Sequence, residues 1–412
     1  MKRIAIIHYA SPPGIGGVEI TIAHQARALL ECGYAVRVIS GDGASFHPDI
    51  ETVINPLFSS SHPEVLRVQA KLAKGEVPAA YQDLVNQISA ALKIALADID
   101  VCIAHNIPTL HKNLALTQAL AKHATETSLP LVAYCHDLAW TNPQYEAELH
   151  DGQPWDLLRR VWPNAAYTTV STMRQEEMMD LLGLPADQVT VITGGIDPAQ
   201  FLRWTDTTRR LVQKLNLMAA DGILLLPARF TRRKNIELAL QILAALRQRS
   251  GADYRLIVTG PPGPHNPTNK SYLENLLELR TQLHLENVAH FLYLEGEDTS
   301  TPLLVDDDTI ADCYQLADAL LFPSTQEGFG IPILEAGLSG IPVFCSYLPP
   351  LRQTGGSDVT YFDPQNSLPS HIASQILSVL NASSTFHLRL RVRQHYRWET
   401  IIRRSLIPLL ER

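Results

Sequence analysis

Residues 325–335 read TQEGFGIPILE and set two carboxylates, Glu327 and Glu335, around a turn that leads into a helix. Gly328 and Gly330 free the backbone between the two acids, and the proline that follows suits a first helical turn. A helix start presents unpaired N–H groups and a partial positive charge, which favour phosphate oxygens. Because carboxylates also accept hydrogen bonds from sugar hydroxyls, the stretch predicts a site for a phosphorylated sugar.

The rest of the chain alternates short apolar or β-branched runs with helical stretches, a pattern typical of parallel sheets covered by helices. The first series consists of a strand at 3–9, an amphipathic helix at 17–31 and a strand at 35–40. A second series has strands at 222–227, 254–260, 288–294, 319–323 and 341–346, with helices that begin at Asn235, Ser271, Thr309 and Ile331. The fold class is therefore α/β, with two Rossmann-like parallel sheets.

A length of 412 residues exceeds what one compact core usually contains, so two domains are expected. The predicted parts are an N-terminal domain at 1–200, a second domain at 201–385 and a C-terminal segment at 386–412. The first boundary follows a strand at 189–192 and the turn GGIDP at 194–198. Four apolar residues of the C-terminal segment have helical spacing and form one face: Trp398, Ile401, Ile402 and Leu406.

Composition argues against several classes of partner. The chain has 34 basic and 42 acidic side chains, a formal net charge of −8, which argues against binding of nucleic acid. No apolar run approaches the roughly 20 residues that cross a bilayer, and the chain opens on strand-like IAIIHYA rather than on a signal peptide. A cytoplasmic location is expected, and peripheral membrane contact stays open. The five cysteines lack a CxxC pair and zinc spacing, so neither a disulfide nor a structural metal is expected.

A glycine-rich loop, SPPGIGGVE at residues 11–19, lies between the first strand and the first helix. Bare backbone in such a loop can approach a diphosphate closely. An NAD fingerprint that began at Gly14 would need a glycine where the chain has Glu19, although Asp42 could serve as the ribose acid of that alternative. The loop alone therefore leaves NAD binding open.

A cluster of cations follows the predicted strand at 222–227, in the stretch LPARFTRRKN. Ligands of open α/β sheets bind at the carboxyl ends of strands, so the cluster is placed for an anion. Arg229 offers a planar fork for phosphate oxygens and Lys234 a point charge, and together they could neutralise a diphosphate leaving group. The alternative is a solvated basic turn, a description that fits Arg232 and Arg233 well.

Polar residues also follow the strands of the first domain. His136 comes directly after a strand at 131–134 and should project from the sheet edge, although a lone histidine is more often structural than catalytic. His105, Asn106 and His8 leave strand ends in the same way and are weaker candidates.

Several of these stretches resemble the retaining glycosyltransferases of the GT-B fold, in particular glycosyltransferase family four. The spacing of Glu327 and Glu335 is similar to the double-glutamate motif of that family. Arg229 and Lys234 match its Arg and Lys, five residues apart, and GGVEITIAHQARALLECGYAVRVIS resembles its opening. The resemblance implies two Rossmann-like domains that face each other across a cleft, with the C-terminal helix returning to the first domain. The first domain would bind the acceptor and the second the nucleotide sugar.

By this resemblance the protein is expected to be a hexosyltransferase, with a nucleotide diphosphate sugar as co-substrate and no other cofactor. The acceptor would be a hydroxyl-bearing small molecule, lipid or glycan. The resemblance implies four catalytic residues: His136 and Glu327 beside the donor sugar, and Arg229 and Lys234 on the departing diphosphate. It further implies substrate contacts from Gly16, Gly17, Gly328, Phe329 and Gly330, and a ribose contact from Glu335.

The acidic run at 306–308 differs from the DxD metal site of the other large glycosyltransferase fold, because no strand leads directly into it. It precedes an apparent helix at 309–316 and is interpreted as a helix cap. With Arg229 and Lys234 available for the diphosphate, turnover is expected to be independent of metal. A sugar-nucleotide epimerase of the same fold and an inactive nucleotide-sugar-binding protein remain alternatives. The sequence names neither base, sugar nor acceptor, and specificity is expected to depend on residues 44–97 and 261–271.

Overall fold

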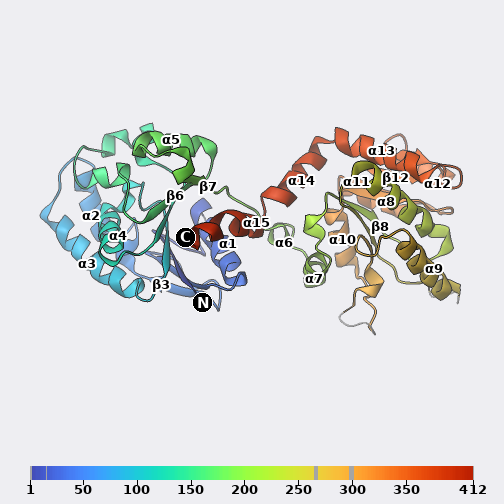
Figure 1. Ribbon diagram of the computed structural model, residues 1–412, viewed down its shortest axis with the longest axis horizontal. Helices are drawn as coiled ribbons and strands as arrows, with labels where there is room; N and C mark the ends of the chain where they lie inside the picture. Colours follow the sequence, from blue (N-terminus) through green and yellow to red (C-terminus); the bar gives the residue numbers. More distant parts are fainter. Residues whose placement is uncertain (1, 15, 264–267, 297–300, 412) are drawn as a thin grey trace. The chain divides into compact units, whose positions relative to one another are not determined.

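Two parallel β-sheets, each covered by helices, organise the protein (Figure 1). The computed structural model describes residues 2–14, 16–263, 268–296 and 301–411. The chain divides into unit 1, which contains Met1–Asp197 and Tyr396–Arg412, and unit 2, which contains Pro198–His395. Each unit holds one sheet, so the predicted pair of Rossmann-like sheets is confirmed.

Unit 1 is built on a seven-stranded sheet with the strand order β3-β2-β1-β4-β5-β6-β7. Every neighbouring pair is parallel, so the carboxyl ends of all strands lie at one edge. The order reverses between β1 and β4, and sheets of this kind bind ligands at the carboxyl edge beside the reversal. The strands are β1 (Arg3–His8), β2 (Ala35–Ser40), β3 (Glu51–Ile54), β4 (Val101–His105), β5 (Leu131–Cys135), β6 (Ala165–Thr169) and β7 (Val189–Val191).

The inner strands of this sheet are buried along their length. All five residues of β4 and all five of β5 are buried, as expected where helices cover both faces of a parallel sheet. Ile4 in β1 lies opposite Val36 in β2 and Val101 in β4, and all three side chains belong to the core. This continuous burial explains the apolar runs in the sequence.

Helix α1 (Gly17–Glu31) has the predicted bounds. Its buried residues Ile22, Ala26 and Leu29 have helical spacing, and Gly33, with φ of +88°, follows its end. The other helices of unit 1 are α2 (Pro63–Leu72), α3 (Ala79–Ala95), α4 (Leu114–Thr127), α5 (Thr172–Leu182), α15 (Trp398–Ile401), a π-helical turn (Ile402–Leu406) and α16 (Ile407–Leu410).

The C-terminal segment of unit 1 packs on the same core as β1 and α1. The four residues of its predicted apolar face are at most 5% exposed and share a cluster with Ile4 and Ile22. Gly195 lies against this segment, because a Cβ atom there would be 2.9 Å from Ile401 Cδ1 and 3.0 Å from Trp398 Cδ2. The backbone N–H of Ile196 donates to the carbonyl of Tyr396 over 2.7 Å. The GGID turn is thus a packing element of unit 1.

Unit 2 is built on a six-stranded parallel sheet with the strand order β10-β9-β8-β11-β12-β13. The order reverses between β8 and β11, so their carboxyl ends mark the expected ligand position of this unit. The strands are β8 (Gly222–Leu226), β9 (Tyr254–Val258), β10 (Ala289–Phe291), β11 (Ala319–Phe322), β12 (Val343–Ser346) and β13 (Thr360–Phe362).

Helices follow most of these strands and cover the second sheet; α8 and α13 pack side by side (Figure 1). The helices of unit 2 are α6 (Pro198–Phe201), α7 (Asp206–Lys214), α8 (Ile236–Ser250), α9 (Thr268–Gln282), α10 (Asp307–Leu316), α11 (Ile331–Leu338), α12 (Pro349–Gly355), α13 (Pro369–Ala382) and α14 (Ser384–His395). Across the described ranges of both units, no helix is long and apolar enough to cross a bilayer.

Some predicted elements differ from the structure. The strand predicted at 288–294 ends at Phe291, because a 3-10 turn occupies Leu292–Leu294. Helix α9 begins at Thr268 rather than at Ser271, which shortens the loop predicted at 261–271, and residues 264–267 of that loop lie outside the described residues. The edge strands β3 and β13 and the inner strand β6 were not predicted.

Candidate functional site

The loops after β8 and β11 form the first part of the candidate site. These strands are parallel neighbours, so the loops that leave their carboxyl ends meet. The backbone N–H of Thr325 donates to the carbonyl of Arg233 over 2.8 Å. In the opposite direction, Arg233 Nη1 donates to the carbonyl of Gln326 over 3.2 Å. These contacts fix the loop after β11, which carries Glu327, against the loop after β8, which carries Lys234.

Lys234 and Glu327 are brought together by these loops. Lys234 Nζ lies 2.5 Å from Glu327 Oε1, and the two side chains are only 11% and 10% exposed. Arg233 Nη1 lies 3.2 Å from Glu327 Oε2, so each carboxylate oxygen has its own cation. Burial lowers the pKa of Lys234, because it disfavours the charged form, while Glu327 opposes the shift. The structure thus pairs two residues that were predicted separately.

Arg229 does not take part in this ion pair. It is exposed, three residues beyond the end of β8, and its guanidinium has no hydrogen-bond or ion-pair partner among the described residues. Arg232 instead packs over the ring of Tyr272, with 5.2 Å between its guanidinium carbon and the ring centroid. Of these two arginines, Arg229 is the one with a free planar fork for an anion at the carboxyl edge of this sheet.

The turn before α11 depends on one of its two glycines. Gly330 is the N-cap of α11 with φ of +96°, and a Cβ atom there would lie 2.5 Å from Leu351 Cδ2. Gly328 has open space around the position of a Cβ atom, so packing does not require a glycine there. Phe329 is 52% exposed, and its carbonyl accepts a hydrogen bond from Thr354 Oγ1 over 2.6 Å. The conformation and packing of the turn therefore require glycine at position 330 but not at position 328.

Glu335, in α11, is held by a residue that the sequence did not indicate. The hydroxyl of Tyr314, in α10, donates to Glu335 Oε2 over 2.5 Å. Burial raises the pKa of Tyr314, and the Glu335 carboxylate adds to this rise, so the tyrosine stays a donor at neutral pH. Since Glu335 is half-buried, its second oxygen remains able to accept a hydrogen bond from a ligand.

The acidic run before α10 is a helix cap, as interpreted from the sequence. Asp306 is the N-cap of α10, and its Oδ1 accepts a hydrogen bond from the backbone N–H of Thr309 over 2.8 Å. Hydrogen bonds from the side chain and the backbone of Thr309 lower the pKa of Asp306. Within the described part of the chain, no three His, Cys, Asp or Glu side chains gather in a group that could hold a metal ion.

In unit 1, three histidines meet at the ends of β1, β4 and β5. His8 Nδ1 lies 2.8 Å from the carbonyl of His105. His105 Nδ1 lies 3.0 Å from His136 Nε2, and His105 Nε2 lies 2.9 Å from Gln25 Oε1. His105 is fully buried and His8 nearly so. The structure therefore joins His136, which was the main candidate, to the two weaker ones.

These histidines are neutral at pH 7. Burial, and to a smaller extent the charge of His8, lower the pKa of His136 to about 4. The pKa of His105 is well below its usual range, again mainly because of burial. Since Gln25 Oε1 can only accept, His105 donates from Nε2 and accepts at Nδ1, so His136 must donate from Nε2. His136 Nδ1 is then an acceptor, with no partner among the described side chains.

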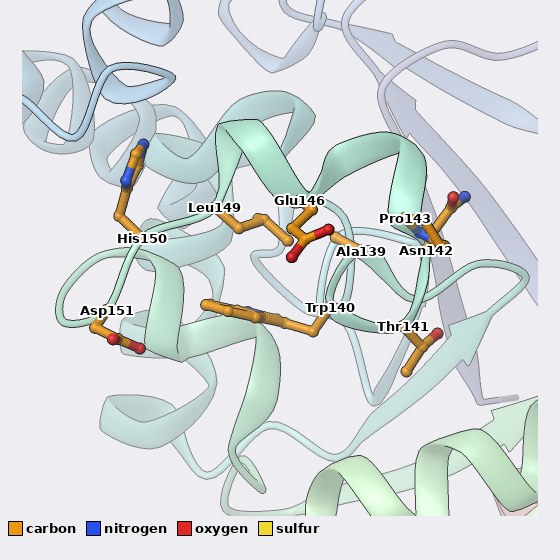
Figure 2. A pocket seen from close by; sticks show the side chains of 9 residues that line it. All are labelled: Ala139, Trp140, Thr141, Asn142, Pro143, Glu146, Leu149, His150 and Asp151. Atoms are coloured by element: carbon orange, nitrogen blue, oxygen red, sulfur yellow. The ribbon is translucent and has the colours of Figure 1, made fainter.

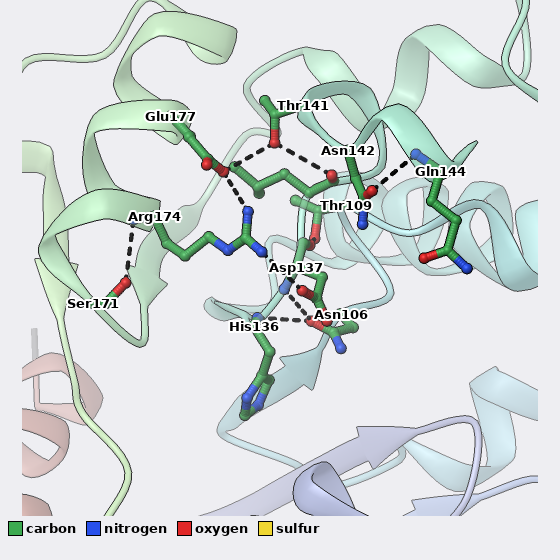
Figure 3. Close-up of polar contacts among 11 residues, drawn as sticks. Asn106, Thr109, His136, Asp137, Thr141, Asn142, Gln144, Ser171, Arg174 and Glu177 are labelled. Atoms are coloured by element: carbon green, nitrogen blue, oxygen red, sulfur yellow. Dashed lines mark hydrogen bonds and ion pairs between the residues drawn. The ribbon is translucent and has the colours of Figure 1, made fainter. Parts of the chain in front are cut away.

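The turn that carries His136 is held by Asn106 (Figure 3). Asn106 has φ of +60°, and its Oδ1 accepts from the backbone N–H of His136 over 2.7 Å and of Asp137 over 3.2 Å. Asp137 in turn pairs with Arg174 over 3.3 Å. Asn106, a weaker candidate for substrate contact, therefore positions the backbone of His136.

Gly16 and Gly17 lie at the start of α1, next to residue 15, which is outside the described residues. Neither has a positive φ. A Cβ atom on Gly17 would meet nothing within 4 Å, and the atoms nearest to one on Gly16 would belong to the flexible side chain of Glu19. Packing therefore does not demand glycine at either position, and the backbone there is open to a ligand.

Two models of known protein families match the chain, one in each half. Residues 15–200 match the model of Glycosyltransferase Family 4, and residues 208–395 match that of Glycosyl transferases group 1. Mannosylglucosylglycerate synthase of Petrotoga mobilis is 26% identical over 66% of this chain and 63% of its own length. O-antigen chain mannosyltransferase B of Escherichia coli is 29% identical over 50% of each chain. The chain thus spans less than two thirds of the length of these relatives.

Among solved structures, the fold is similar to that of Anabaena HepE, whose crystal structure contains UDP and glucose. That likeness covers 100% of both chains, with 18% identity and a TM-score of 0.36. Family membership therefore rests on the two sequence models rather than on this superposition.

Proposed function

Because the chain belongs to the GT-B glycosyltransferases of family 4 and group 1, we propose that it transfers a hexose from a nucleotide diphosphate sugar to a hydroxyl-bearing acceptor. The observation that carries this proposal is the nearly buried pair Lys234–Glu327 together with the exposed guanidinium of Arg229, on the loops that follow the carboxyl ends of β8 and β11. At the carboxyl edge of one sheet, a carboxylate that can accept hydrogen bonds from sugar hydroxyls thus lies with cations that can bind a diphosphate.

On the donor side, each group has a role that its surroundings support. Arg229 would bind diphosphate oxygens with its planar fork, and Lys234 has N–H groups left besides the one that faces Glu327. Charge develops on the diphosphate as the glycosidic bond breaks, so these fixed cations would stabilise the transition state. Glu327 would orient the sugar, and the free oxygen of Glu335 would accept from a ribose hydroxyl.

Retention of the anomeric configuration and independence of metal are part of the proposal. The departing diphosphate, held by Arg229 and Lys234, would take the proton of the acceptor hydroxyl. His136, neutral and with Nδ1 as an acceptor, would bind a sugar hydroxyl rather than act as an acid. The two cations would supply the charge that a divalent ion supplies elsewhere.

A donor screen tests this proposal. Three donors, GDP-mannose, UDP-glucose and ADP-glucose, are compared for thermal stabilisation, since a ligand that binds the folded form raises its Tm. Mannose is included because the names of the two relatives refer to mannosyl groups. We expect one donor to raise the Tm, and its turnover with an acceptor to continue in EDTA. The control is Arg249→Ala, in the last turn of α8 and far from the carboxyl end of β8. The donor should raise the Tm of this variant as much as it raises that of the original chain.

Two outcomes would contradict the proposal. If none of the donors raises the Tm, the proposed donor site is wrong. If turnover requires added Mn²⁺ or Mg²⁺, the proposed independence of metal is wrong. NMR of the donor without acceptor separates the remaining functions, because an epimerase would convert the sugar and a binding protein would leave it intact.

A further inference from the structure

A pocket of about 670 Å³ lies in unit 1, and none of its lining residues is a site residue predicted from the sequence (Figure 2). It is formed by two 3-10 turns, Ala139–Thr141 and Pro143–Glu148, and by the residues that follow them. Its first lining residue, Ala139, comes three positions after His136. The pocket thus lies on the segment that leaves the carboxyl end of β5.

One wall of the pocket is a fixed aromatic ring. Trp140 donates its indole N–H to the carbonyl of Trp155 over 3.3 Å. The guanidinium of Arg159 packs 4.0 Å from the Trp140 ring centroid and pairs with Asp151 over 2.6 Å. Figure 2 shows the side chains of Glu146 and Leu149 on one side of this ring. A ring held in this way offers a flat apolar surface at little cost in conformational entropy.

The rest of the lining offers both acceptors and donors of hydrogen bonds. Glu146 is exposed, and within the described ranges its carboxylate has no hydrogen-bond or ion-pair partner. Asn142 accepts from the backbone N–H of Gln144 with its Oδ1, over 3.0 Å, which leaves its amide NH₂ as a donor. A hydroxyl group needs a donor and an acceptor together, and this lining supplies the two.

The segment between His136 and the pocket is held by one polar network (Figure 3). Thr141, which lines the pocket, donates to Glu177 Oε2 over 3.0 Å. Glu177 pairs with Arg174 over 2.6 Å, and Arg174 reaches Asp137. The same network therefore fixes the turn of His136 and Thr141 in the lining of the pocket.

We propose that this pocket binds a sugar ring of the acceptor, so that the acceptor is a carbohydrate or a glycoside. The inference rests on the proposed transferase function and names the class of its second substrate. The C–H face of a pyranose packs on an aromatic ring, while its hydroxyls pair with carboxylate and amide groups. The Glu146 carboxylate, which has no cation paired with it among the described residues, would repel a phosphate, and an acyl chain would cover it without offering a partner, so a phospholipid fits poorly.

Saturation-transfer difference NMR on the full chain tests the pocket directly. The probes are methyl α-D-mannopyranoside, methyl α-D-glucopyranoside and maltose, with hexane-1,2-diol as a hydroxyl compound without a ring. We expect at least one sugar, and not the diol, to receive saturation. Trp140→Ala and Glu146→Gln should each weaken sugar binding at least fivefold, while Trp140→Phe should keep part of it because a flat ring remains.

The matched control is Glu126→Gln, an exposed acid near the end of α4, before β5 begins and so at the other end of that strand. Thermal stabilisation by the donor, measured on the same samples, shows that each variant is folded. Donor binding with no sugar binding, or with unchanged sugar binding in Trp140→Ala and Glu146→Gln, would overturn the pocket assignment. Failure of every donor to bind would instead contradict the proposed function.

Discussion

Lys234 and Glu327 lie 93 positions apart in the sequence and form an ion pair of 2.5 Å at the edge of the second sheet. Because both side chains are nearly buried, the pair links stability to the candidate site. Arg233, the second cation on Glu327, is about half exposed and would compensate only in part if Lys234 were removed.

Lys234→Met should therefore lower both stability and turnover. Removing one partner of a buried pair costs roughly 3 to 5 kcal/mol, and because Arg233 remains we expect a loss of about 2 kcal/mol in the free energy of unfolding. Urea unfolding of Lys234→Met, Glu327→Gln and the double variant gives the coupling energy. Additive effects in this cycle would mean that the pair contributes no stability.

Arg229→Ala should separate function from stability. The side chain is exposed and has no partner among the described residues, so the free energy of unfolding should stay within about 0.5 kcal/mol of the original. Loss of a preorganised cation should lower kcat about 100-fold or more. Arg249→Ala, an exposed arginine in the last turn of α8, should leave both quantities unchanged. Equal kcat in the two variants would refute the role of Arg229.

Most inner elements could be predicted because their patterns are local; the exception is β6, whose sequence AAYTT lacks a run of large apolar residues. The bounds of α1 and β2 agree with prediction, since helical periodicity and β-branched runs are visible within a few residues. Strands β3 and β13 have four and three residues, lie at the sheet edges and are partly exposed, so they lack the apolar run of inner strands. Their pairing depends on neighbours that are distant in sequence.

The same limit applies to the candidate site. The motifs pointed to Lys234 and Glu327 individually, but their pairing follows from β8 and β11 being neighbours, which the sequence order does not state. Tyr314 belongs to no motif, and Gln25 lies in the opening stretch without being singled out there; their roles appear only when helices pack next to the residues they contact. Local spacing was therefore enough to indicate Lys234 and Glu327. The roles of Tyr314 and Gln25 depend on long-range packing and could not be predicted.

Tyr314→Phe should weaken nucleotide binding through Glu335. The hydroxyl of Tyr314 holds one oxygen of that carboxylate, so its loss should free the side chain and raise the Kd of the donor about threefold to tenfold. Glu335→Ala should raise the Kd further, because the ribose contact itself is lost. Calorimetric titration with the donor measures both. A larger effect in Tyr314→Phe than in Glu335→Ala would argue against this order of roles.

His136 should make stability depend on pH. Its folded pKa of about 4 lies below the ordinary value of 6.5, so between these values the unfolded chain binds a proton that the folded chain does not. The contribution of His136 to the free energy of unfolding should fall as pH falls through this window, by about 2 kcal/mol between pH 7 and pH 5. His136→Asn should show a correspondingly smaller fall, whereas His371→Gln, an exposed histidine on α13, should behave like the original chain. An unchanged pH dependence in His136→Asn would contradict this account.

Gln25 should set the tautomer of His136 through His105. In the original chain the amide oxygen of Gln25 makes His105 donate from Nε2, which leaves His136 protonated at Nε2 and an acceptor at Nδ1. Gln25→Leu keeps an apolar group of similar size at this fully buried position but removes that constraint, so either ring nitrogen of His105 could carry the proton. Nitrogen-15 NMR of labelled histidine at pH 7 should show one tautomer of His136 in the original chain and a mixture in the variant. Since hydroxyl binding at Nδ1 requires the acceptor form, kcat should fall while the Kd of the donor nucleotide stays constant. The same single tautomer in both chains would show that Gln25 has no part in this relay.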